Sequence, residues 1–100
     1  MSMEREAPKI IALDYDGTCT THINFWTLFI EAATKCGFRV LLVTMRTPEE
    51  AQDIAHSITT RVERVICTSR KAKIAFLQDL GIHPAIWIDD MPQALFQDFS

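Results

Sequence analysis

The feature that most constrains the fold is a short apolar run, Ile10-Ile11-Ala12-Leu13, followed directly by Asp14-Tyr15-Asp16-Gly17-Thr18. A short apolar run bounded by turn residues predicts a strand that is buried on both faces of a sheet. Carboxylates at the end of such a strand are costly without a cation, and open α/β sheets bind ligands at this edge. The stretch therefore predicts a site for a hard metal ion or for phosphate, with a strand end capped by two solvated Asp residues as the plainer alternative.

The rest of the chain alternates between strand patterns and helix patterns. Asn24 and Ser69 are the expected N-caps of two helices, and Thr47 begins a third in which Pro48 and Glu50 agree with a helix start. Alternating strands and helices predict a parallel sheet with right-handed crossovers, an α/β, Rossmann-like three-layer sandwich of about four strands. The expected strands are 9–14, 38–44, 62–67 and 84–90, and the expected helices are 25–36, 47–58, 69–80 and 91–99.

Composition limits the class of protein. The 100 residues predict one domain, with residues 1–8 as a flexible lead-in. The net charge of −3 argues against a broad electrostatic hold on nucleic acid. Apolar runs stay well below the roughly 18 residues that cross a bilayer, and the charged start does not read as a signal peptide. Three cysteines without CxxC spacing indicate neither a disulfide framework nor a zinc site, so we expect a cytoplasmic protein without membrane partners.

Polar side chains that could carry chemistry follow three of the four predicted strands. Asp14 and Asp16 follow the first, Thr44 ends the second, and Asp89 and Asp90 follow the fourth. Because the carboxyl ends of parallel strands lie at one edge of a sheet, these side chains are expected to meet. Mg²⁺ prefers oxygen ligands and binds through one or two carboxylates plus a substrate phosphate. The sequence therefore predicts a magnesium site, with the Thr44 hydroxyl donating to a phosphate oxygen.

Basic residues near this edge are the candidates for balancing its negative charge. Lys71 and Lys73 lie just before the fourth predicted strand, and we favour Lys73 for contacting the phosphate, with Lys71 second. Arg46 is the candidate for contacting the substrate beyond its phosphate, and a solvated surface Arg is an equal alternative. The other candidate substrate-binding residues flank the two strand ends: Gly17, Thr18 and Met45.

Four motifs occur in a fixed order between residues 10 and 92: Asp-x-Asp-Gly-Thr, an apolar strand ending in Thr, a helix-borne Lys, and an apolar strand ending in Asp-Asp. This ordered set resembles the haloacid dehalogenase (HAD) superfamily of phosphohydrolases. The resemblance implies that Asp14 is a nucleophile that becomes an aspartyl-phosphate, and that Asp16 is the general acid and base. It also implies that Asp14, Asp89 and the backbone carbonyl of Asp16 hold Mg²⁺. Asp90 would complete or orient the metal's ligands, and Thr44 and a Lys would hold the phosphate.

The implied activity is magnesium-dependent hydrolysis of phosphate monoesters. Members of this superfamily usually carry a cap domain, but residues 18–25 and 45–62 leave no room for one. Members without a cap act on large substrates, such as phosphoproteins or nucleic-acid ends, or borrow a neighbouring surface as a lid. The residues do not choose between these substrates, a sugar phosphate and a nucleotide. A small homo-oligomer would bury the surface that the lack of a fifth strand leaves exposed.

Three other functions fit parts of the pattern. A receiver-like phosphoacceptor domain also groups Asp, Thr and Lys around Mg²⁺, but its paired acids come first in the chain, whereas here they come last. A non-catalytic binding or regulatory module could use the same scaffold, because a fold does not determine function. A phosphoryl mutase or a dehalogenase is disfavoured, because a mutase needs a cap to shield its intermediate and Asp16 favours phosphoryl chemistry.

Overall fold

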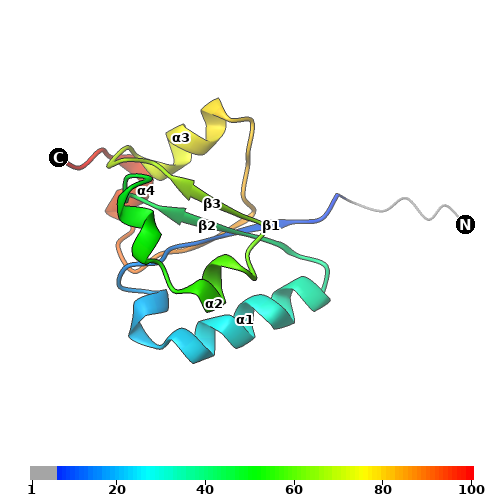
Figure 1. The fold of residues 1–100 in the computed structure, drawn as a ribbon. Helices are drawn as coiled ribbons and strands as arrows, with labels where there is room; N and C mark the ends of the chain where they lie inside the picture. Colours follow the sequence, from blue (N-terminus) through cyan, green and yellow to red (C-terminus); the bar gives the residue numbers. More distant parts are fainter. Residues whose placement is uncertain (1–6) are drawn as a thin grey trace, which may run out of the picture.

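The computed structural model describes residues 7–100 and shows a four-stranded parallel sheet between layers of helices (Figure 1). The strands lie in the order β3-β2-β1-β4. The α/β class, the parallel sheet and the number of strands are therefore as the sequence predicts. Residues 1–6 of the expected lead-in lie outside the described residues. The strand bounds are β1 (Ile10–Leu13), β2 (Arg39–Thr44), β3 (Arg64–Cys67) and β4 (Ile86–Ile88).

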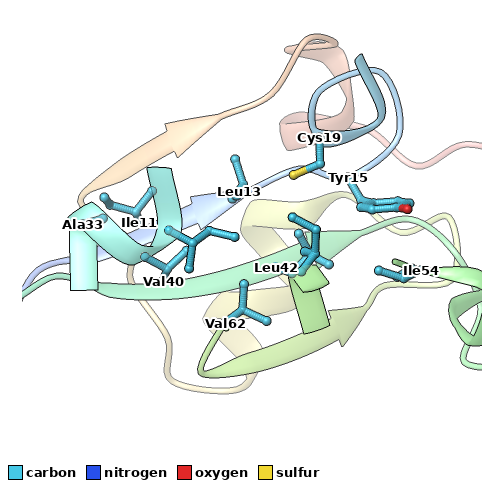
Figure 2. Close-up of a cluster of buried hydrophobic side chains, with 11 residues drawn as sticks. Ile11, Leu13, Tyr15, Cys19, Ala33, Val40, Leu42, Ile54 and Val62 are labelled. Atoms are coloured by element: carbon cyan, nitrogen blue, oxygen red, sulfur yellow. The ribbon is translucent and has the colours of Figure 1, made fainter. Parts of the chain in front are cut away.

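Helices cover both faces of the sheet. α1 (Ile23–Lys35) and α2 (His56–Thr59) lie on one face, and α3 (Lys73–Asp79) and α4 (Gln93–Phe96) lie on the other (Figure 1). Side chains alternate along β1 and β2, so one core holds Ile11 and Leu13 and the other holds Ala12. Figure 2 shows the first core, in which strand residues gather with Ala33 of α1. The three-layer arrangement is therefore confirmed.

The connections at the carboxyl edge are short. Residues 14–22, between β1 and α1, contain only the 3₁₀ turn η1 (Cys19–Thr21), and residues 45–63, between β2 and β3, contain η2 (Glu50–Asp53) and α2. Neither connection holds a cap domain, as expected. Within residues 7–100, every helix is too short or too polar to cross a membrane.

The first predicted helix begins earlier than expected. α1 starts at Ile23, and the backbone N–H of Phe25 donates to Nδ1 of His22 over 3.3 Å. The N-cap is therefore His22 and not Asn24, because a ring nitrogen can accept the same hydrogen bond as the usual capping oxygen. The helix ends at Lys35, just before Gly37, whose φ of +93° suits a residue without a side chain.

The predicted helix over 47–58 is wrong as a continuous element. Thr47 and Glu50 do exchange the two hydrogen bonds of a capping box, but the helix stops after η2 and turns extended at Ile54. Ile54 is buried in the core, and the next backbone N–H, that of Ala55, donates to the Tyr15 hydroxyl over 3.1 Å. A tertiary hydrogen bond thus replaces a helical one.

The predicted helix over 69–80 begins four residues late. Ser69 and Arg70 have φ values of 53° and 70°, which lie in the left-handed region and prevent an α-helix. Ser69 is therefore not an N-cap, and α3 begins at Lys73 after Ala72. The predicted end is correct, since Gly81 at φ +74° follows α3 closely. β4 and α4 are shorter than the expected 84–90 and 91–99.

Candidate active site

The pairing of β1 with β4 brings the two acidic motifs together. Leu13 pairs with Ile88, and the backbone N–H of Asp14 donates to the Ile88 carbonyl over 2.9 Å. Asp14 and Asp89, the residues that directly follow β1 and β4, therefore leave the sheet side by side. β2 lies on one side of β1 and β4 on the other, so the strand order reverses at β1. Such a switch point is where open α/β sheets form a ligand crevice.

A buried lysine joins these two carboxylates. Nζ of Lys73, from the first residue of α3, donates to Asp14 Oδ1 over 2.7 Å and to Asp89 Oδ2 over 2.6 Å. The Lys73 side chain is only 2% exposed. Lys71 is 65% exposed and lies 3.9 Å from Asp98. The structure therefore separates the two candidate lysines and brings only Lys73 to the acidic edge.

Gly17 and Thr18 position the carboxylates from the other side. The Thr18 hydroxyl lies 3.1 Å from Asp14 Oδ2 and 3.3 Å from Asp90 Oδ1, and it accepts the Asp90 backbone N–H over 3.3 Å. A Cβ atom on Gly17 would lie 2.3 Å from Asp90 Oδ2, so Asp90 depends on the absence of a side chain there. A direct contact of Gly17 or Thr18 with substrate stays a prediction.

Asp14, Asp89 and Asp90 are arranged so that they could hold a divalent cation. Each offers one oxygen, and these three oxygens lie within 4.8 Å of one another. Three carboxylates and the Lys73 ammonium leave two negative charges, which a divalent cation would balance. All donors are oxygens, as Mg²⁺ prefers. The Asp16 carboxylate is not in this group, and the expected contribution of the Asp16 backbone carbonyl stays a prediction.

Burial changes the protonation chemistry of this site. It raises the pKa of Asp14 to about 6, although the Lys73 ammonium acts in the opposite direction. Burial and the nearby Asp14 charge also raise the pKa of the Cys19 thiol to about 12. The Cys19 thiol donates to the Asp14 carbonyl, at 3.2 Å. Cys19 therefore stays protonated and packs in the core, which makes it unsuited to act as a nucleophile.

Asp16 turns away from the buried carboxylates toward Arg46. Arg46 Nε donates to Asp16 Oδ2 over 2.9 Å and Nη2 donates to Oδ1 over 2.8 Å, so both carboxylate oxygens are engaged. These hydrogen bonds lower the pKa of Asp16. Thr44 is buried at the end of β2, where its hydroxyl oxygen accepts the Arg46 backbone N–H over 3.2 Å. The Thr44 hydroxyl proton is left for donation to another oxygen.

Three residues near Arg46 were not among the sequence candidates. Tyr15 is buried with its ring 5.2 Å from the Arg46 guanidinium, and Arg70 forms a two-pronged ion pair with Glu50. The side-chain alternation of a strand places Tyr15 on the core face, opposite its acidic neighbours, so its burial could have been predicted. The pairing of Arg70 with Glu50 spans 20 residues and leaves no local signal.

The acidic edge borders a cavity of about 140 Å³. Its lining contains six of the predicted site residues, Asp14, Asp16, Met45, Lys73, Asp89 and Asp90, together with Met91 and Ala94, which were not predicted. Comparisons of the chain with known protein families, curated proteins and solved structures find no match in any of the three.

Proposed function

We propose that this chain is a magnesium-dependent phosphohydrolase that cleaves phosphate monoesters through an aspartyl-phosphate on Asp14. One observation carries the proposal: the buried Lys73 ammonium bridges Asp14 and Asp89 beside Asp90, at the switch point of a parallel sheet. The four motifs that resemble the HAD superfamily supply these residues in the order that the superfamily uses.

The buried charged side chains have separate roles in binding the phosphate. Asp14, Asp89, Asp90 and the Asp16 carbonyl would hold Mg²⁺. When bound, the ion offsets the repulsion between an anionic nucleophile and an anionic ester. Lys73 holds the Asp14 carboxylate in a fixed orientation and provides a positive charge for the phosphate oxygens. The Thr44 hydroxyl donates to another of these oxygens.

Two in-line displacements then complete the reaction. An Asp14 carboxylate oxygen attacks phosphorus, the bond to the leaving oxygen breaks, and Asp16, protonated when it is not paired with Arg46, gives that oxygen a proton. Asp16 next takes a proton from water, the water oxygen attacks phosphorus, and the bond to Asp14 breaks. Inorganic phosphate leaves, and both carboxyl groups return to their starting state.

Replacement of the nucleophile tests the proposal. Wild-type protein should hydrolyse para-nitrophenyl phosphate when Mg²⁺ is present and lose this activity with a chelator. Asp14→Asn should lower the rate about 10³-fold or more, because an amide cannot form the phosphorylated intermediate. Asp79→Asn, a neutralised acid at the exposed end of α3, is the matched control and should keep wild-type activity.

Circular dichroism of each variant checks that the fold is kept. Wild-type protein that turns over neither para-nitrophenyl phosphate nor a panel of phosphorylated metabolites and 3′- and 5′-phosphorylated oligonucleotides would favour the non-catalytic module. A stable phosphoprotein without turnover would favour the receiver-like domain.

A further inference from the structure

A second, larger cavity adjoins the acidic edge. Its volume is about 560 Å³, and it shares Asp16 and Met45 with the smaller cavity. Arg46 and Arg70 both line it, so two guanidinium groups lie beside the place where a leaving group would sit. The proposed reaction does not use either arginine.

Contacts other than Asp16 hold Arg46 in place. Its Nη1 donates to the Glu50 carbonyl over 2.7 Å, and its guanidinium lies over the Tyr15 ring at 5.2 Å. Asp16 is the more exposed partner, with 53% of its side chain accessible against 24% for Arg46. The two groups form a partly exposed ion pair, which solvent screening weakens. Asp16 can therefore leave while Arg46 stays.

The backbone of Arg70 is fixed in an unusual conformation. Its φ of 70° is in the left-handed region, which costs free energy for a residue with a side chain. Its backbone N–H and its Nη1 both donate to the Met45 carbonyl, over 2.9 and 2.6 Å. These contacts keep the Arg70 guanidinium at the cavity independently of its exposed partner Glu50.

We propose that Arg46 and Arg70 form a subsite for a second phosphate on the leaving group, and that occupation of this subsite releases Asp16 toward the scissile ester. The two planar guanidinium groups match a doubly charged phosphate better than a single carboxylate does. The release matters because both Asp16 oxygens are held by Arg46 and neither is free to face a leaving oxygen. The preferred substrates are thus bisphosphates, an inference that rests on the proposed phosphohydrolase function.

Matched pairs of synthetic esters test this subsite. We would compare kcat/KM for α,ω-alkanediol bisphosphates of two to six carbons with kcat/KM for the corresponding alkyl monophosphates. The wild type should prefer the bisphosphate by about tenfold or more at an optimal chain length, as expected for one added charge-assisted contact. A phosphorylated dinucleotide carries its second phosphate as a diester. Its kcat/KM, compared with that of the best bisphosphate, distinguishes a nucleic-acid end from a small bisphosphate as the preferred substrate.

Arginine variants identify the groups responsible. Arg46→Gln and Arg70→Gln should each reduce the preference for the bisphosphate toward unity. Arg39→Gln is the matched control, because Arg39 forms the same two-pronged ion pair with Glu63 but is the first residue of β2, at the opposite end of the strands. This control should keep the wild-type preference. An equal preference in wild type and Arg46→Gln, or no preference in wild type, overturns the proposal.

A binding measurement separates this inference from the proposed function. Calorimetry on Asp14→Asn should show tighter binding of the best bisphosphate than of its monophosphate, and addition of Arg46→Gln should remove the difference. An affinity difference that depends on Arg46, together with a wild-type protein that shows no turnover, would keep the subsite and reject the catalysis. Turnover by the wild type without any such affinity difference would support the catalysis and reject the subsite.

Discussion

At the scale of single residues, the site depends on one lysine that is almost fully buried. Lys73 is the first residue of α3, and the left-handed Ser69 and Arg70 delay the helix so that it starts there. The ammonium replaces its lost hydration with contacts to Asp14 and Asp89, whose side chains are also buried. Such groups are costly to bury singly and stable only together.

Lys73→Ala should lower the free energy of unfolding by about 3–5 kcal/mol without added metal, because it leaves two buried carboxylates without a counter-charge. Urea denaturation followed by circular dichroism measures the change. Lys71→Ala removes an exposed lysine and should change the unfolding free energy by less than about 0.5 kcal/mol. Similar losses in the two variants would contradict the central place of Lys73.

At the scale of elements, the loop between β1 and α1 fits closely against the end of β4. Gly17 has φ +82°, and the space where its Cβ would lie is taken by the Asp90 carboxylate. The loop and the acidic strand end can therefore approach only because residue 17 has no side chain. Gly81 also has a positive φ, +74°, but open space surrounds it.

This pair of glycines allows a controlled test of the metal site. Gly17→Ala and Gly81→Ala should each cost about 1–2 kcal/mol of stability through left-handed backbone strain. Only Gly17→Ala should also displace Asp90, and we expect it to weaken Mg²⁺ binding about tenfold, measured by calorimetry at a temperature where both variants are folded. Equal Mg²⁺ affinities would mean that Asp90 is not a metal ligand.

The four strands could be predicted from sequence, whereas the helices expected over 47–58 and 69–80 could not be predicted correctly. Apolar runs buried on both faces fix strands strongly, and the shared edge of a parallel sheet placed the acids of β1 and β4 together. Thr47 and Glu50 form the expected capping box, but the helical segment that this box begins ends where the Ala55 backbone N–H donates to the Tyr15 hydroxyl. The ion pair between Asp16 and Arg46 spans 30 residues, and such distant pairs carry no periodic signal.

At the scale of the whole molecule, β4 is one of the two edge strands of the described sheet. β4 pairs only with β1 among the described strands, and Ile86 is 39% exposed. Beside it lies an apolar cavity of about 340 Å³ whose lining includes Phe29, Ile86 and Ile88. The expected homo-oligomer stays a prediction, as does the cytoplasmic location.

The stability of the whole metal-free molecule should depend on pH through Asp14. Its pKa is about 6 in the folded chain and 3.8 ordinarily, so between these values the folded state binds a proton that the unfolded state does not. The contribution of Asp14 to stability is therefore full below about pH 4 and is lost as the pH rises through 6.

We expect the unfolding free energy, measured with a chelator, to fall less steeply with pH across this window in Asp14→Asn than in the wild type. Asp98→Asn, which neutralises an exposed acid beside Lys71, is the control and should follow the wild-type curve. Identical slopes in wild type and Asp14→Asn would show that Asp14 titrates normally.

The position of β4 in the chain has a consequence for synthesis on the ribosome. The strand that completes the acidic edge is the last of the four to be made, while its partner β1 is the first. A nascent chain therefore carries Asp14 long before Asp89 and Asp90 exist to join it, and Lys73 precedes Asp89 by 16 residues. The proposed magnesium site can form only after β4 has been synthesised, so a polypeptide that stops before β4 should neither bind the ion at this site nor cleave esters.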